Sequence, residues 1–299
     1  MNLIELRNIH KSFEAHKALN GVSFSIPQGS IFGLLGPNGA GKTTSIRIIN
    51  QIIAPDEGEI LFQGRPIRRE DIQKVGYLPE ERGLYKKMNI ADQVIYLGQL
   101  KGLSKSEATH RCKQWFERFD LQKWWNKHVA DLSKGMQQKV QFIATIIHEP
   151  ELVILDEPFS GFDPVNAEIL KEEILNLKQR GATILFSSHR MESVETLCDS
   201  LVMIHQSRVM LSGTTREIRM AHKSSDMELH FTGTTPEWMN SYSVKENEDG
   251  KSVVLPISEI SINDWLGKAL QSQLTIHACR EMIPGLHEIF IQTVQNNQS

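Results

Sequence analysis

The most informative segment of this sequence reads Gly36-Pro37-Asn38-Gly39-Ala40-Gly41-Lys42-Thr43-Thr44. It fits the pattern G-x-x-x-x-G-K-[ST], in which glycines let successive backbone N–H groups turn towards phosphate oxygens. At this spacing Lys42 supplies a positive charge for the β- and γ-phosphates, and the Thr43 hydroxyl is placed for Mg²⁺. A β-type run at 30–35 precedes the segment and a helical pattern follows at 43–50, so a helix dipole also faces the phosphates. We therefore expect all the quoted residues to bind a nucleoside triphosphate.

A second apolar run, at 152–155, ends in two carboxylates, Asp156 and Glu157. In an open α/β sheet, side chains at the carboxyl ends of the strands meet at the ligand-binding edge. Asp156 is expected to hold Mg²⁺, directly or through water, and Glu157 to polarise the water that attacks the γ-phosphate. Alone, such a run could be a strand that enters an acidic surface turn. The phosphate-binding segment upstream favours the catalytic interpretation.

The spacing of apolar residues predicts an α/β fold with a mostly parallel sheet covered by helices. The segment from 90 to 147 is largely helical in pattern, and Asp163 with Pro164 begins a helix that Gly181 ends. Short strands are expected at 3–9, 22–26, 30–35, 59–62, 75–78, 152–155 and 183–187.

The pattern changes near Gly213. Asp249-Gly250 lies between two β-type runs and predicts a hairpin. Two further strands, at 227–231 and 274–278, and two helices, at 262–271 and 286–294, are expected in this part. We therefore predict a main domain at 1–213 and a small C-terminal α+β module at 214–299.

Charge and composition narrow the class of protein. The 299 residues are 40% hydrophobic and 23% charged with a net charge of −3, as in an ordinary globular protein. Arg65, Arg68 and Arg69 are followed at once by Glu70 and Asp71, so they indicate a mixed-charge surface and not a nucleic-acid patch. No nucleic-acid partner is expected.

The cysteines and the hydropathy bear on location. Cys112, Cys198 and Cys279 form no CxxC pair, so neither a zinc site nor a disulfide framework is predicted, and a reducing cytoplasm fits. The first residues lack an apolar signal core. No apolar stretch approaches the ~20 residues that span a bilayer. We therefore expect a cytoplasmic protein that a partner would have to hold at a membrane.

A further segment carries a resemblance to a known family: Leu132-Ser133-Lys134-Gly135-Met136-Gln137-Gln138 resembles the LSGGQ signature of ABC ATPases. In that family the signature contacts the γ-phosphate held by the opposite subunit, so two subunits clamp two ATP molecules. Ser133 is a suitable helix N-cap, and Gly135 would allow close approach. Lys134 and Met136 depart from the family pattern.

Other segments match family elements less specifically. Ser160-Gly161-Phe162-Asp163 resembles the loop that crosses the dimer interface, although Asp163 is also the helix cap. His189 resembles the histidine that contacts the γ-phosphate and orients the attacking water. Phe13 matches the aromatic residue that stacks on adenine, or is a core phenylalanine. Glu80 stands where the family has a glutamine that reaches Mg²⁺; it could ligate the metal, face solvent or pair with Arg82.

The resemblance implies the function of the whole chain. The run at 80–85 and the motif at 284–290 resemble the sodium and drug efflux branch, and 84–147 matches the helical subdomain that contacts membrane partners. An Mg²⁺-dependent ATPase is implied that powers an exporter. It would act as a homodimer, or as a heterodimer with a paralogous subunit, on a separate polytopic permease at the inner face of the cell membrane.

Two alternatives remain open on sequence grounds. A soluble ABC ATPase acting on ribosomes, nucleic acid or metal-cluster assembly is disfavoured by the single nucleotide domain and the lack of a basic stripe or coiled-coil insertion. A regulatory module that no longer hydrolyses ATP is disfavoured because Glu157 and His189 are both present. The transported substance is not encoded in this chain, because substrate contacts belong to the permease.

Overall fold

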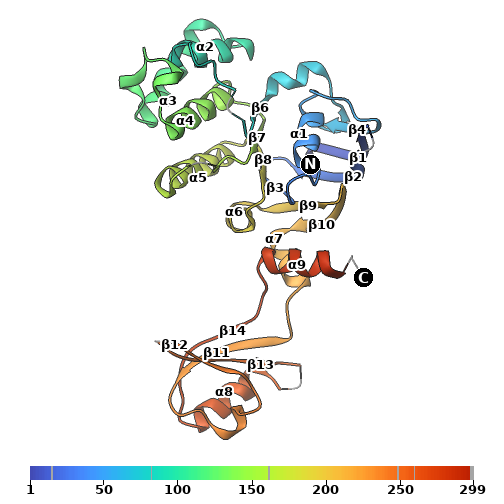
Figure 1. Ribbon diagram of the computed structural model, residues 1–299, viewed down its shortest axis with the longest axis vertical. Helices are drawn as coiled ribbons and strands as arrows, with labels where there is room; N and C mark the ends of the chain where they lie inside the picture. Colours follow the sequence, from blue (N-terminus) through green and yellow to red (C-terminus); the bar gives the residue numbers. More distant parts are fainter. Residues whose placement is uncertain (15, 82, 161, 248, 259, 297–299) are drawn as a thin grey trace. The chain divides into compact units, whose positions relative to one another are not determined.

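The computed structural model describes residues 1–14, 16–81, 83–160, 162–247, 249–258 and 260–296. The chain folds into two compact units, Met1–Thr215 and Arg216–Ser299, which are described separately. Figure 1 shows the helices and strands of each unit. Within the described residues, no helix is both long and apolar enough to cross a bilayer.

The centre of the first unit is a six-stranded sheet with the order β10-β9-β3-β8-β7-β6. All neighbouring strands in it are parallel except β10, which is antiparallel to β9. The predicted mostly parallel sheet is therefore confirmed. Its strands are β3 (Ile31–Leu35), β6 (Val75–Leu78), β7 (Leu152–Asp156), β8 (Thr183–Ser188), β9 (Ser200–His205) and β10 (Arg208–Thr214).

A second, antiparallel sheet with the order β2-β1-β4-β5 shares a core with the first. Apolar side chains from both sheets meet there, among them Ile4, Phe24 and Phe62 from one sheet and Leu34 and Ile154 from the other. This shared core fixes the β1–β2 hairpin beside the phosphate-binding segment. The strands are β1 (Asn2–Phe13), β2 (His16–Pro27), β4 (Glu57–Phe62) and β5 (Arg65–Pro66).

Polar caps set the starts of several helices. The side chains of Ser104, Ser133 and Asp163 each accept a hydrogen bond from a backbone N–H three residues later, which satisfies a donor that the helix leaves free. The caps predicted at Ser133 and Asp163 are confirmed. The helices of the first unit are α1 (Lys42–Ile49), α2 (Ile90–Leu100), α3 (Lys105–Arg118), α4 (Lys134–Ile146), α5 (Pro164–Gln179) and α6 (Met191–Leu197), with 3₁₀ turns at Arg69–Lys74, Gln122–Trp124 and Val129–Asp131.

The second unit is a four-stranded antiparallel sheet, ordered β12-β13-β11-β14, with its own core around Phe231, Leu255 and Trp265. The predicted hairpin is present, since Asn247 pairs with Gly250. The extra α+β module predicted from the sequence is therefore confirmed as a fold. Its elements are α7 (Thr215–Ala221), β11 (Asp226–Thr232), a 3₁₀ turn (Glu237–Met239), β12 (Val244–Asn247), β13 (Gly250–Pro256), α8 (Ile262–Gln271), β14 (Thr275–Glu281) and α9 (Leu286–Asn296).

Candidate nucleotide site

The glycine-rich loop joins β3 to α1, and two of its glycines are required by the fold itself. Gly36 has φ 150° and Gly41 has φ 113°, and residues with a Cβ rarely adopt these angles. A Cβ at Gly36 would lie 2.2 Å from the Ile204 carbonyl oxygen, and one at Gly41 would lie 2.6 Å from that of Ala18. Backbone packing against β9 and β2 therefore determines the shape of the loop.

Lys42 is held inside this loop. Its Nζ donates hydrogen bonds to the carbonyl oxygens of Gly36 at 2.7 Å and Pro37 at 3.2 Å, and the residue is only 7% exposed. Burial lowers the pKa of Lys42, and the nearby charges of Glu157 and Asp156 act in the opposite direction. A phosphate group entering the loop would supply further negative charge next to this ammonium group.

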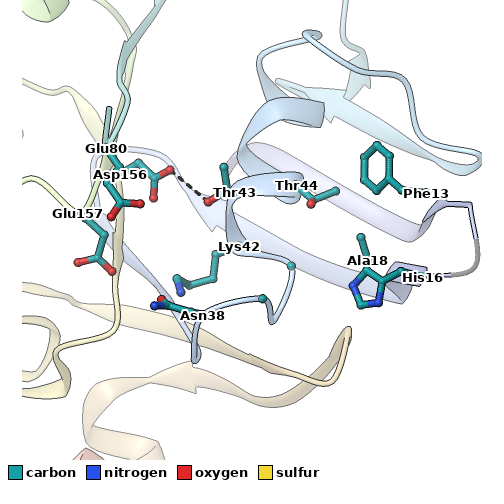
Figure 2. A pocket seen from close by; sticks show the side chains of 12 residues that line it. Phe13, His16, Ala18, Asn38, Lys42, Thr43, Thr44, Glu80, Asp156 and Glu157 are labelled. Carbon is teal, nitrogen blue, oxygen red and sulfur yellow. Dashed lines mark hydrogen bonds between the residues drawn. The ribbon is translucent and has the colours of Figure 1, made fainter. Parts of the chain in front are cut away.

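Thr43 and Asp156 face each other across the site, with Thr43 Oγ1 3.4 Å from Asp156 Oδ2 (Figure 2). Asp156 is 2% exposed, and burial raises the pKa of its carboxyl group, helped by the charges of Glu80 and Glu157. A divalent cation would stabilise the ionised carboxylate. Two protein oxygens, completed by water and phosphate, are the kind of ligand set that Mg²⁺ takes, so these residues fit the ion.

Glu157 and His189 are in direct contact. The Glu157 carboxylate accepts hydrogen bonds from the His189 backbone N–H at 2.7 Å and from Ser188 Oγ at 3.3 Å, and His189 Nδ1 lies 2.7 Å from Glu157 Oε1. Glu157 itself has φ 50°, which is uncommon for a residue with a side chain. Its side chain is 9% exposed and that of His189 51%. A carboxylate fixed by three contacts is well placed to orient a water molecule.

Lys42, Thr43, Asp156 and Glu157 border one cavity of about 330 Å³, whereas His189 is not among the described residues that line it. Figure 2 shows Asp156, Glu157 and Glu80 at one end, the loop with Lys42 in the middle, and Phe13 at the other end. Phe13 is 46% exposed and therefore is not a core phenylalanine. Two lining residues, His16 and Ala18, were not predicted. The feature of the sequence that could have indicated them is their position just after Phe13, across the hairpin turn. The lining consists of Phe13, His16, Ala18, Asn38, Gly39, Gly41, Lys42, Thr43, Thr44, Glu80, Asp156 and Glu157.

Glu80 follows β6 on a segment that α4 supports. Gln141 Nε2 donates to the carbonyl oxygens of Pro79 at 3.4 Å and Glu81 at 3.3 Å. Glu80 is exposed and borders the cavity, so both its metal and its solvent interpretations fit. The alternative pairing with Arg82 involves a residue outside those that the structure describes.

Ser133, Gly135 and Asp163 are not among the described residues that line this cavity. Ser133 is exposed and caps α4, where its hydroxyl accepts from the Met136 N–H at 3.3 Å. Asp163 caps α5 and accepts from the Asn166 N–H at 3.0 Å, which lowers the pKa of the carboxyl group. Gln138 Nε2 hydrogen-bonds the Ser160 carbonyl and so ties the two segments together. Gly161, quoted above with Asp163, lies outside the described residues.

A phosphate-binding loop that faces buried and hydrogen-bonded carboxylates defines a nucleotide-hydrolysing protein of the P-loop class. Comparison with known proteins narrows this class. A family model described as "ABC transporter" matches residues 19–160, and one described as "ATP-binding protein DrrA1-3-like, C-terminal domain" matches residues 213–294.

Similar proteins agree with these matches. The ABC transporter ATP-binding protein YhaQ of Bacillus subtilis is 43% identical over 295 residues, which is 98% of each chain. The Nod factor export ATP-binding protein I of Burkholderia lata is 34% identical over 213 residues, 70% of each chain. A solved structure of an ATP-binding subunit of an ABC transporter superposes with a TM-score of 0.69 at 33% identity, covering 74% of this chain and 93% of that one.

The chain therefore belongs to the ATP-binding subunits of ABC transporters, in the ABC-2 exporter branch, and it is an ATPase. The predicted family and activity are confirmed. Subunits of this family work with membrane permease subunits.

Proposed function

We propose that this chain is the motor of an exporter, in which two copies, or one copy and a paralogue, hydrolyse ATP to drive a separate membrane permease. The observation that carries the proposal is the Glu157 carboxylate, which His189 and Ser188 hold at the end of a cavity that also contains Lys42. Export is supported by the name of the Nod factor relative and by the DrrA-like C-terminal domain.

In this proposal the nucleotide lies along the cavity with its base on Phe13. The loop N–H groups and Lys42 bind the phosphates, and Thr43 and Asp156 would hold Mg²⁺, with Glu80 as a further oxygen donor. When bound, the ion neutralises negative charge on the phosphate oxygens. Asn38 and Gly39 border the middle of the cavity, where the phosphates would lie.

Hydrolysis would then depend on how well the water is positioned. Glu157 accepts a hydrogen bond from the attacking water, because its carboxylate is acceptor-only when ionised. His189 keeps that carboxylate in place, since its backbone N–H and its ring nitrogen both lie 2.7 Å from the same oxygen. Positioning of this kind is the main contribution that a protein makes to phosphoryl transfer.

The second copy would complete each site. Ser133 and Gly135 at the start of α4, and Asp163 at the start of α5, are on the surface of the chain and outside its own cavity. A helix start with an exposed hydroxyl favours an anion, because its free N–H groups and dipole point outwards. We infer that these residues approach the ATP bound by Lys42 of the other subunit.

The permease is proposed to dock on a mainly apolar groove of about 310 Å³ between the end of β6, α2 and α4. Leu84, Leu97 and Ala144 line it. Tyr85, Tyr96 and Leu100 of the same region are 62%, 44% and 60% exposed. Exposed apolar surface of this kind marks a protein contact. Through this contact the subunit would act at the cytoplasmic face of the cell membrane.

Two substitutions test the catalytic assignment. Glu157→Gln should retain ATP binding and lower the steady-state ATPase rate by about 10²–10⁴-fold, because an amide is a poor base for water. Lys42→Ala should weaken ATP binding itself. Glu168→Gln on α5, where the side chain is 64% exposed, is the matched control and should leave both unchanged. Near-normal turnover by Glu157→Gln would remove Glu157 from the mechanism.

A further inference from the structure

The tip of the β1–β2 hairpin forms the end of the nucleotide cavity that lies away from the carboxylates. Phe13 and His16 are paired across the two strands, and both border the cavity. Figure 2 shows the two rings at this end, with Ala18 beside His16 and Thr44 between Phe13 and the rest of the loop. His16 therefore borders the same end of the cavity as Phe13.

Hydrogen bonds to Asp56, the residue directly before β4, hold the tip of the hairpin in place. Asp56, directly before β4, accepts a hydrogen bond from Lys11 Nζ at 2.6 Å through one oxygen and from the Ser12 N–H at 2.7 Å through the other. Lys11 Nζ lies over the Phe13 ring, 5.6 Å from its centroid. Asp56 also donates its own N–H to the His10 carbonyl at 2.8 Å. These contacts fix the tip in front of the cavity.

The polarity of the lining shows what this end can recognise. Phe13 offers a ring face for stacking, and Ala18 offers only a methyl group. Among the described lining residues beyond the loop and α1, His16 is the polar side chain at this end. An imidazole has both a donor and an acceptor nitrogen when neutral. Ribose hydroxyls and the edge of a base need such partners.

We infer that His16 is a specificity-determining residue that hydrogen-bonds the nucleoside part of ATP while the base stacks on Phe13. The inference rests on the base-binding role of Phe13 proposed above. The phosphates would lie further along the cavity, at the loop and Lys42, so the contribution of His16 depends on the ribose and base being present. Its loss should therefore affect ATP and leave a bare phosphate chain unaffected.

The test is isothermal titration calorimetry of the full-length chain with Mg-ATP and with Mg-tripolyphosphate. His16→Ala should raise the Kd for ATP about three- to tenfold, the effect of one lost hydrogen bond. The Kd for tripolyphosphate should stay the same. His16→Gln, which keeps a donor and an acceptor, should recover part of the affinity. His10→Ala on the neighbouring strand β1, outside the cavity lining, is the matched control and should change neither Kd.

Three outcomes separate the possibilities. If Phe13→Ala selectively weakens ATP binding but His16→Ala does not, the inference fails and the proposed base site stands. If neither variant affects ATP, the base site itself is wrong. If His16→Ala weakens ATP and tripolyphosphate equally, a nucleoside contact is overturned. Repeating the titrations with 2′-deoxy-ATP locates the contact: an effect lost with this analogue assigns it to the ribose, and one retained assigns it to the base or the 3′-hydroxyl.

Discussion

Two glycine-containing loops of this chain are expected to meet phosphate groups, and their surroundings differ. In the phosphate loop, the backbone of β9 and β2 leaves no room for a Cβ at Gly36 or Gly41. At the start of α4, a Cβ on Gly135 would meet only the Asn166 side chain, at 3.9 Å. The first loop is shaped by its own chain, whereas nothing described in the chain requires glycine at position 135.

This difference indicates whether each glycine serves the fold of its own chain or a contact with a second subunit. Where neighbouring backbone leaves no room for a Cβ, the glycine is needed for the fold, and replacing it should lower the free energy of unfolding. The open space around Gly135 leaves room for a contact from outside the chain. The contrast supports a site shared between two subunits, and it can be tested position by position.

The largest effect is expected from Gly36→Ala. The new Cβ would lie 2.2 Å from the Ile204 carbonyl oxygen, at a φ of 150°. Removing this clash requires β3 and β9 to separate. The free energy of unfolding should therefore fall by more than about 3 kcal/mol. Chemical denaturation of the purified chain measures this. Normal stability would show that the loop is less tightly packed than the structure indicates.

Gly135→Leu should leave stability unchanged and lower ATPase activity. The helix has room for the side chain, so the melting temperature and ATP affinity of the single chain should hold, while ATPase activity falls by about 100-fold as the second subunit is displaced. Gly267→Leu in α8 is the matched control, because the helix has room for a side chain there too: a Cβ on Gly267 meets nothing within 4 Å. That variant should keep full activity. Full activity of Gly135→Leu would mean that no phosphate-bearing partner approaches this loop.

A smaller effect is expected at Glu80, which borders the site without being buried in it. Glu80→Gln removes a negative charge that attracts Mg²⁺ and repels phosphate. The Mg²⁺ concentration for half-maximal ATPase activity should rise about two- to fivefold, as befits an exposed charge. Without Mg²⁺, ATP should bind more tightly. Superimposable Mg²⁺ titrations of this variant and the wild type would leave Glu80 as a surface residue.

Almost no effect on binding is expected from removing the second unit. Its core, around Phe231 and Trp265, is separate from that of the first unit. A chain that ends after Thr215 keeps β10 whole and the Thr215 hydrogen bond to the Cys198 carbonyl. Its Kd for Mg-ATP should change by no more than about twofold. Loss of binding from a folded, monodisperse truncation would give the second unit a part in the nucleotide site.

Most of the fold could be predicted because local signals agreed with tertiary structure. The helix predicted at 262–271 is α8 with the same bounds, begun by the Ser261 cap. The β9–β10 hairpin was not predicted. Its turn is Gln206-Ser207, with φ values of 46° and 67°, where hairpins of this type usually have Asn-Gly. A residue far away in the sequence holds the turn instead, since the Ser207 carbonyl accepts a hydrogen bond from the Asn20 N–H.

In the site too, local patterns predict some residues, whereas tertiary contacts determine others. Lys42, Thr43 and Asp156 follow from residue types at fixed spacing, and the structure brings them together. The contact between Glu157 and His189 joins residues 32 positions apart, and Glu157 has a positive φ; no local pattern reveals either. His16 was missed because a single histidine in a hairpin has no chemical meaning until the cavity is known.

The central claim is that each catalytic site combines Lys42 of one subunit with Ser133 of the other. Co-expression of a Lys42→Ala chain with a Ser133→Arg chain tests it most directly, because the mixed dimer keeps one intact composite site and neither homodimer keeps any. ATPase activity should be lost in each variant alone and return in the purified mixed dimer. Wild-type activity of folded Ser133→Arg alone, or a mixed dimer no more active than the separate variants, would contradict a shared site.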